Sequence, residues 1–245
     1  MPEAAARAAL LPSTAAPQRR PPCRVIDLGR CGYAQAFDLQ RELVAARKRG
    51  AVCDQLVFVE HPPTITLGRN ARTANVLAPA DRLRALGVAV EETDRGGDVT
   101  YHGPGQVVAY PILDLKGWRR DVGAYLRALE EVIIATLADF GIPSWRDPGL
   151  TGVWTQRGKV AALGVHLSRW VTSHGLALNV STDLGHFRLI VPCGLTKPVT
   201  SMRELLGSAP RRTEVIGAMR RHFGDVFGRA MGEIRPGRGK NRHLA

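Results

Sequence analysis

The 245-residue sequence lacks any apolar run close to the roughly 18 residues that span a bilayer as a helix. Its first 22 residues also lack the continuous apolar core of a secretory signal, and they are rich in Ala, Pro and Arg. We therefore expect a soluble, cytoplasmic protein that does not bind membranes. This Ala/Pro/Arg-rich, acid-poor composition predicts a solvated, disordered tail over residues 1–22, with a transit peptide as the alternative.

Paired cysteines are also missing. The four cysteines are Cys23, Cys31, Cys53 and Cys193, and no two of them have C-x-x-C spacing. No Cys/His cluster has the regular spacing of a zinc site, so we expect no metal and no cofactor. Three of the cysteines fall in the first quarter of the chain, where a free thiol usually behaves as a small buried apolar group. Cys193 stands apart from them.

Acidic residues are fewer than basic ones, and the formal net charge is +12. Residues 1–24 carry +3 of this charge and residues 229–245 carry +4, so the middle of the chain is only moderately basic. This distribution argues against a nucleic-acid-binding surface, which needs clustered Lys and Arg. Arg211, Arg212, Arg220 and Arg221 form one cluster, which predicts a solvated helix face or a surface that attracts an acidic protein partner.

Internal repeats and Pro/Gly/Ser-rich linkers are absent from the middle of the chain, which alternates between strand and helix patterns. We predict a single α/β (α+β-like) domain over residues 23–228, with a mixed, largely antiparallel sheet flanked by helices, and a basic polar tail over residues 229–245. The predicted strands are 23–29, 56–60, 64–68, 88–92, 106–115, 152–155, 159–167 and 174–180, and the predicted helices are 33–50, 79–86, 121–141 and 213–228.

A glycine-rich stretch, RGGDVTYHGPGQ, occupies residues 95–106. It lacks the G-x-x-x-x-G-K-[ST] of a phosphate-binding loop, and a strand follows it where a nucleotide site needs a helix N-terminus. Its polar side chains, on a backbone that glycine lets approach a ligand closely, predict the wall of a binding site. The polar side chains are Arg95, Asp98, Thr100, Tyr101, His102 and Gln106.

A second unusual stretch, FRLIVPCGLTKPVTS, covers residues 187–201 and contains Cys193. A cysteine at the end of a buried strand, with glycine behind it, predicts an exposed thiol that could act as a nucleophile. Such a thiol needs a partner that lowers its pKa or takes its proton. His102, His166, His174 and Lys159 are the candidates, and spacing alone does not choose between Cys–His and Cys–Lys. We expect His166 inside a strand, and His102 and His174 in loops.

Several motifs in order resemble the lipoyl(octanoyl) transferase family of lipoate synthesis. They are RGGDVTYHGPGQ with VVAYPILDL, then GKVAALGVHL, HGLALNV and VPCGL, and they cover roughly residues 25–206. The resemblance implies transfer of an octanoyl group from an acyl carrier protein to a lysine of a lipoyl domain or of the glycine-cleavage H protein. It also implies the fold of lipoate and biotin protein ligases. We expect a monomer that has no nucleic-acid partner. The acyl length follows from the resemblance alone.

The same resemblance assigns roles to residues. It implies that Cys193 carries the acyl group as a thioester and that Lys159 lowers the pKa of this thiol and acts as acid and base. Lys197 adds a cation near the cysteine and is a rival to Lys159. The resemblance further implies a substrate-binding set consisting of Arg95, Gly96, Gly97, Asp98, Val99, Thr100, Tyr101, His102, Ala162, Leu163, Gly164, Gly175, Leu176 and Ala177.

Two other classes of function stay open at this point. One is an ATP-dependent ligase of the lipoate or biotin type, which would need a basic Gly/Arg-rich adenylate loop in place of RGGDVTYH. The other is a non-catalytic module that binds a carrier protein or nucleic acid. The absence of the adenylate loop and the presence of Cys193 favour transfer without ATP.

Overall fold

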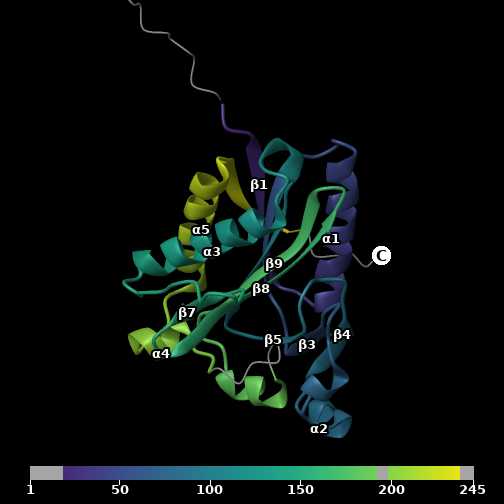
Figure 1. The fold of residues 1–245 in the computed structure, drawn as a ribbon, viewed down its shortest axis with the longest axis vertical. Coiled ribbons are helices and arrows are strands. Elements are labelled where there is room, and N and C mark those ends of the chain that lie inside the picture. The colour runs from purple at the N-terminus through teal and green to yellow at the C-terminus, as the bar shows by residue number, and fades with distance from the viewer. Residues whose placement is uncertain (1–18, 192–197, 238–245) are drawn as a thin grey trace, which may run out of the picture.

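The computed structural model describes residues 19–191 and 198–237, and two β-sheets organise them (Figure 1). The larger sheet has the strand order β10-β1-β2-β6-β9-β8-β7. Strand β1 runs parallel to β2 and β10, and the other neighbours are antiparallel, which confirms the predicted mixed, largely antiparallel sheet. Its strands are β1 (Pro22–Arg30), β2 (Asp54–Glu60), β6 (Gln106–Ile112), β7 (Val153–Thr155), β8 (Gly158–Ser168), β9 (Val171–Asn179) and β10 (Ala230–Pro236).

The smaller sheet forms a separate lobe with the order β4-β3-β5. Its strands are β3 (Thr64–Leu67), β4 (Ala89–Glu92) and β5 (Val99–His102), and short helices surround it, namely η1 (Thr73–Asn75), α2 (Ala80–Ala85) and η3 (Leu184–Leu189). Ile65, Val99, Tyr101 and Phe187 belong to the core of this lobe. The middle of the glycine-rich stretch, Val99–His102, is thus a buried strand paired with β3, where the sequence predicts a loop.

Helices cover both faces of the larger sheet (Figure 1). Helices α3 (Val122–Asp139) and α5 (Arg212–Phe227) pack on one face, and α1 (Tyr33–Lys48) packs on the other. The Asp121 side chain accepts a hydrogen bond from the Ala124 amide and so begins α3. Short helices η2 (Leu115–Gly117) and α4 (Met202–Leu206) complete the fold. No helix among the described residues is long and apolar enough to cross a membrane.

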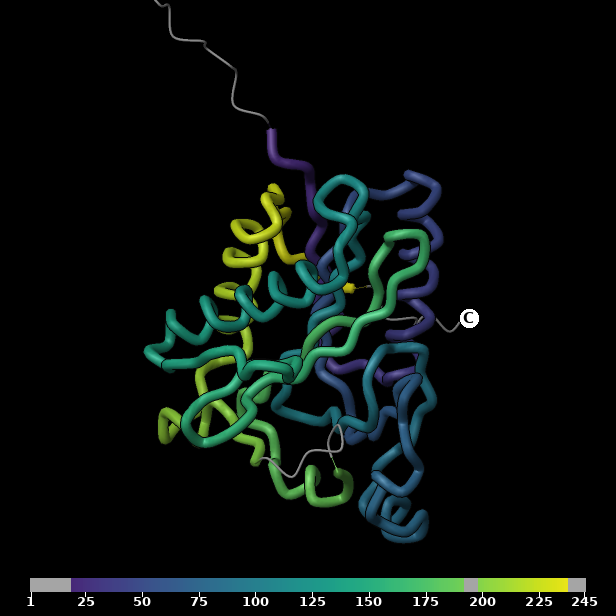
Figure 2. The backbone as a smooth tube through the Cα atoms, viewed as in Figure 1, coloured from purple at the N-terminus to yellow at the C-terminus, as the bar shows by residue number. Residues whose placement is uncertain are grey.

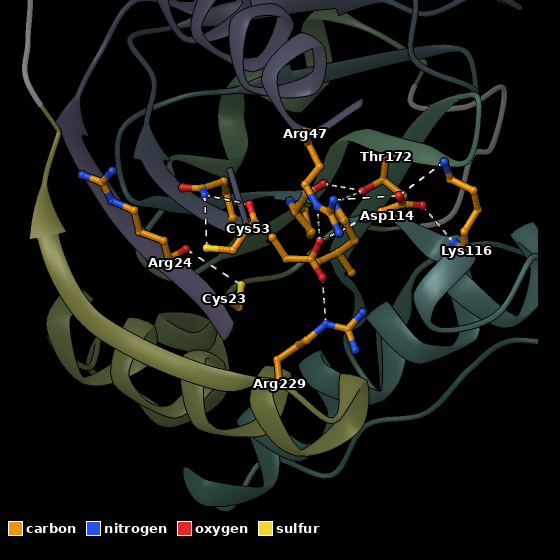
Figure 3. A network of polar contacts seen from close by, with 12 residues as sticks. Cys23, Arg24, Arg47, Cys53, Asp114, Lys116, Thr172 and Arg229 are labelled. Atoms are coloured by element: carbon orange, nitrogen blue, oxygen red, sulfur yellow. Dashed lines mark hydrogen bonds and ion pairs between the residues drawn. The ribbon is translucent and has the colours of Figure 1, made fainter. Parts of the chain in front are cut away.

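The expected polar tail from residue 229 is wrong for Ala230–Pro236, which form strand β10 beside β1 (Figure 2). The reason is a buried ion pair that charge composition alone does not reveal. Arg229 is 5% exposed, and its Nε lies 2.8 Å from Asp54 Oδ2. Arg47 Nε lies 2.8 Å from the other carboxylate oxygen, and Figure 3 shows Arg47 and Arg229 reaching in from opposite sides. A cation with such a buried partner belongs to the folded domain.

The arginine cluster near α5 is also internally paired. Arg212 makes two hydrogen bonds of 2.7 Å to the Asp27 carboxylate, and Arg221 Nη2 lies 3.1 Å from Asp139 Oδ2. The Arg220 side chain donates to the backbone carbonyls of Met231 and Gly232, while Arg211 pairs with Glu214. Arg212 is thus tied to β1 by a part-buried ion pair, whereas the ion pairs of Arg211 and Arg221 are largely exposed, as expected of a solvated helix face.

Candidate active site

A pocket, called the inner pocket below, lies over the middle of β8 and β9. Its floor contains two cross-strand pairs, Ala162 opposite Ala177 and Gly164 opposite Gly175. Because all four residues are small, the sheet leaves space above this part of its surface. A Cβ on Gly175 would lie 2.3 Å from the Ala109 carbonyl oxygen of the neighbouring strand, so the close approach of β9 to β6 requires glycine there.

The small lobe and α1 form the other side of the inner pocket. Arg95, Thr100 and His102 come from the lobe, and Tyr33 comes from the first residue of α1. Arg95 is 6% exposed, and its guanidinium donates hydrogen bonds to the backbone and side-chain oxygens of Thr66 at 2.7 and 2.9 Å. These bonds hold a buried cation at the wall of the pocket, and they explain why the arginine can be buried.

Buried aromatic and histidine side chains close the end of the inner pocket away from the beginning of β8. The His61 Nε2 atom lies 2.8 Å from the Tyr110 hydroxyl, and its Nδ1 lies 2.7 Å from the Cys31 carbonyl oxygen. The carbonyl can only accept, so Nδ1 carries the proton and Nε2 accepts from Tyr110. Burial lowers the pKa of His61 to about 4. This histidine is therefore neutral at neutral pH.

Burial has the same effect on the other two histidines at the pocket. It lowers the pKa of His102 well below its usual value, and the nearby His61 and Arg95 lower it further. Burial also lowers the pKa of His174, against the opposing effect of a 2.6 Å hydrogen bond between its Nε2 and Asp94.

Lys159 lies near the beginning of β8, beside the inner pocket. Its Nζ donates a 2.9 Å hydrogen bond to the Thr151 carbonyl oxygen and lies 5.4 Å from the centroid of the Trp154 ring. The buried carboxylate of Glu130 accepts a 2.9 Å hydrogen bond from the Gly152 amide, which fixes the turn before β7. A Cβ on Gly152 would lie 2.4 Å from Lys159 Cε, so glycine makes room for the lysine.

The described segment that follows residue 197 lies against this lysine. The Lys159 amide donates to the Pro198 carbonyl oxygen at 2.9 Å, and the Thr200 amide donates to the Lys159 carbonyl oxygen at 2.9 Å. On the upstream side, Val191 and Lys159 line one outer groove, described below. Cys193 and its neighbour Lys197 lie outside the described residues.

A buried chain of side-chain hydrogen bonds joins the inner pocket to the segment after residue 197. His102 Nδ1 lies 3.2 Å from Gln106 Oε1, and Gln106 Nε2 donates to Asn179 Oδ1 at 2.9 Å. Asn179 Nδ2 then donates to the Thr200 carbonyl oxygen at 3.0 Å. All four residues are buried: His102 is 7% exposed, and the other three are less exposed. Their buried polar groups are thereby satisfied.

The structure brings most of the predicted substrate-binding set together. The members that line the inner pocket are Arg95, Gly97, Thr100, His102, Ala162, Leu163, Gly164, Gly175, Leu176 and Ala177. Tyr101 lines a smaller pocket beside it, which also contains Lys159, Gln106 and Asn179. Gly96 and Asp98 line the outer groove. Val99 instead packs in the core of the small lobe.

Sequence reasoning missed Tyr33, Val108 and Tyr110, which line the inner pocket. The only sequence signal for any of them is Tyr110, an aromatic residue within the otherwise aliphatic run of β6. The expected loop position of His174 is wrong, because His174 lies within β9, which extends the predicted strand 174–180 back to Val171, and it has a positive φ of 55°. His102, also expected in a loop, ends strand β5. Strand β9 forms a hairpin with β8, whereas β5 pairs with the more distant β3.

No group of three or more His, Cys, Asp or Glu side chains that could hold a metal ion occurs within residues 19–191 and 198–237. The inner pocket offers a buried cation, imidazoles and hydroxyls, and a largely apolar floor, with about 40 Å³ of free space. Such a lining suits an apolar group.

Solved structures with a similar fold include lipoate protein ligases. A bipartite lipoate protein ligase from Thermoplasma acidophilum matches with a TM-score of 0.69 and 16% identity, covering 88% of this chain and 87% of that chain. A lipoate-protein ligase A bound with ATP matches with a TM-score of 0.68 and 16% identity, covering 88% and 89%. At this identity, the likeness establishes the predicted fold.

Curated relatives are much closer in sequence. The octanoyltransferase of Solibacter usitatus is 59% identical over 205 residues, which cover 84% of this chain and 93% of the relative. The octanoyltransferases of Koribacter versatilis and Chloroflexus aurantiacus (strain J-10-fl) are 51% and 53% identical over 83% and 82% of this chain, and the alignments cover 84% and 92% of those relatives. The family model for the lipoyl protein ligase A/B catalytic domain matches residues 32–224. The chain belongs to the lipoyl protein ligase A/B catalytic domain family.

Proposed function

We propose that this protein is an octanoyltransferase that moves an octanoyl group from an acyl carrier protein to a lysine of a lipoyl domain or of the glycine-cleavage H protein. In this proposal Cys193 holds the acyl group as a thioester, and Lys159 serves as acid and base. Curated octanoyltransferases that are 51–59% identical to the chain over most of its length support the transfer reaction.

The observation that carries the proposal is the inner pocket. It has a largely apolar lining, a floor made by Ala162, Gly164, Gly175 and Ala177, and a free volume of about 40 Å³, and a second space of about 20 Å³ is lined by Ala162, Ala177 and Lys159. An acyl chain that lies on this floor with its carbonyl carbon toward Lys159 would have to widen the two spaces. Burial of the chain in such a pocket stabilises the complex by about 0.8 kcal/mol per methylene.

The first chemical step would exchange one thioester for another. The Cys193 thiolate attacks the thioester carbonyl of the donor, a new C–S bond forms, and the bond to the carrier thiol breaks. The leaving thiolate takes up the proton that the Cys193 thiol gave to the solvent or to Lys159. Because a lysine ammonium within about 4–6 Å favours the thiolate, Lys159 would activate the cysteine before attack.

The second step would form the amide. The amine of the acceptor lysine attacks the Cys193 thioester, the C–S bond breaks, and the proton lost by the amine passes to the cysteine or to Lys159 in its neutral form. The Thr151 carbonyl oxygen, 2.9 Å from Lys159 Nζ, would orient the lysine in both steps. This step is downhill because an amide is more stable than a thioester.

The test is to mix the protein with octanoyl carrier protein in the absence of ATP and to measure its intact mass. The expected result is an octanoyl adduct that hydroxylamine removes, and Cys193→Ala should not form it. The variants Cys23→Ala and Cys31→Ala serve as controls and should still form the adduct. An adduct that requires ATP would favour a ligase, and an undiminished adduct on Cys193→Ala would overturn the assigned nucleophile.

A further inference from the structure

A second open space, the outer groove, lies next to the inner pocket and has a volume of about 810 Å³. One of its walls is polar and comes from the loops of the small lobe, with Asn70, Asn75 and Asp98. The Asp98 carboxylate accepts hydrogen bonds from the amides of Arg72 and Val99 at 3.1 and 2.8 Å and from the Asn75 side chain. This wall is therefore held in place by its own hydrogen bonds.

The opposite wall is apolar. Val122 and Leu126 come from the first turns of α3, and Leu150 comes from the loop before β7. Val122 is 42% exposed, so its side chain is accessible from the groove. The groove thus has one hydrogen-bonding side and one apolar side along the same path.

The groove and the inner pocket meet at their inner ends. Gly97, Leu163 and Gly164 line both spaces, and Lys159 lines the groove. A substrate whose acyl chain lies in the inner pocket, with its reacting carbonyl near Lys159, would continue outward through this groove. The outer groove would then hold the thiol half of the acyl donor, which lies on the other side of the thioester bond from the acyl chain.

The polar groups of the groove indicate the chemistry of that part. The lining carries one carboxylate, Asp98, and two cations, Arg72 and Lys159, together with Asn70 and Asn75. Paired asparagines facing aliphatic side chains fit a neutral, extended chain in which amide groups alternate with short alkyl segments. A pantetheine arm has this composition, because two amides separate its alkyl segments and its outer end carries two methyl groups.

We propose that the outer groove binds the pantetheine arm of the acyl donor, with Val122 contacting the methyl groups of the arm and Asn70 and Asn75 facing its amides. This inference rests on the proposed octanoyltransferase function and names the site at which the enzyme distinguishes a carrier-bound thioester from a simple one. The groove sets selectivity for the thiol half of the donor, while the inner pocket sets selectivity for the acyl half.

The test compares two donors that share the octanoyl thioester, namely octanoyl-pantetheine and octanoyl-N-acetylcysteamine, whose short thiol ends before the outer half of the arm. Acylation of the protein by each donor is followed by intact mass. Val122→Asp should slow acylation by octanoyl-pantetheine about tenfold, equivalent to about 1.4 kcal/mol, and should change the rate with the short donor less than about twofold. An acidic residue in the first helical turn is compatible with α3, so the variant should fold.

Ile234→Asp is the matched control, because Ile234 is 41% exposed on β10 and contributes nothing to the groove lining. It should leave both rates unchanged. Equal losses for the two donors with Val122→Asp, or no loss for either, would overturn the groove assignment. A Val122→Asp defect confined to transfer onto the acceptor lysine would also overturn it. A wild-type protein that neither donor acylates would instead overturn the proposed function.

Discussion

Gln106 and Asn179 lie directly opposite each other on β6 and β9, and the Gln106 side chain donates a 2.9 Å hydrogen bond to the Asn179 side chain. Both residues are almost fully buried, at 1% and 4% exposure. Asn179 in turn donates to the Thr200 carbonyl oxygen, and the Thr200 amide donates to the Lys159 carbonyl oxygen. The pair therefore joins the wall of the inner pocket to the strand that carries Lys159.

Replacing Asn179 by leucine should destabilise the protein and slow its acylation. The Thr200 carbonyl oxygen and the Gln106 amide would each lose a buried partner, which costs about 1–3 kcal/mol. Chemical denaturation measures the stability, and the rate of octanoyl adduct formation measures the reaction. Gln156→Leu, at the exposed turn between β7 and β8, is the control and should change stability by less than about 0.5 kcal/mol. Equal stabilities for the two variants would contradict the prediction.

Most strands and helices could be predicted because their residues follow a local period. Helix α1 matches the apolar spacing that ends in Lys, Arg and Gly, and β6 matches an apolar run buried on both faces. Strand β5 could not be predicted in this way, because glycines on both sides of it indicate a loop. It exists because β3 pairs with it and because Val99 and Tyr101 enter the core of the small lobe.

The residues of the candidate site also fall into those that local motifs reveal and those that only tertiary contacts bring together. Motifs supplied Lys159 and the residues of the pocket floor, since these lie in two strands that are adjacent in sequence. Tyr33 and Tyr110 come from α1 and β6, and only the tertiary fold places them at the closed end of the inner pocket. The strand β10 was misjudged for a related reason, because the partner of Arg229 lies 175 positions away at Asp54.

Lys159→Met should slow acylation of the protein by about 100-fold, the size typical of losing a general acid or base. It should also raise the pKa of the Cys193 thiol, because the neighbouring ammonium is removed. The rate of iodoacetamide alkylation at Cys193 as a function of pH, read from peptide masses, measures this pKa. Lys116→Met, which removes a half-exposed lysine of η2, is the control. An unchanged alkylation profile would direct attention to Lys197.

Arg229→Ala should lower the free energy of unfolding by about 3 kcal/mol, because it leaves part of the buried Asp54 carboxylate without its cation. The contact is 2.8 Å long between side chains that are 4% and 3% exposed. Arg20→Ala breaks a 3.0 Å ion pair with Asp225 whose side chains are 54% and 69% exposed, and it should cost less than about 1 kcal/mol. Urea denaturation of both variants decides the comparison, and similar losses would refute the structural role assigned to Arg229.

Stability should fall as the pH is lowered from about 6.5 to 4, because the buried histidines must be protonated. The pKa of His61 is about 4 in the folded protein and about 6.5 in the unfolded chain, so the unfolded chain binds more protons throughout this window. His61 alone accounts for about 3 kcal/mol of lost stability at the acidic end. His61→Gln should flatten the pH dependence of the unfolding free energy. Parallel curves for the variant and the wild type would contradict this assignment.

Acyl length should depend on the aromatic end of the inner pocket. Tyr33 is 5% exposed and lines this pocket. A Tyr33→Trp variant fills space that the end of an eight-carbon chain would occupy, at an overpacking cost of about 1–3 kcal/mol. We expect octanoyl adducts to form about tenfold more slowly, with butanoyl adducts unaffected, since a missing or blocked methylene contact is worth about 1–3 kcal/mol. The ratio of the two rates does not depend on the fraction of the protein that is folded. Val90→Trp, at a 45% exposed position of β4, should leave that ratio unchanged, and an unchanged ratio in Tyr33→Trp would mean that the acyl chain lies elsewhere.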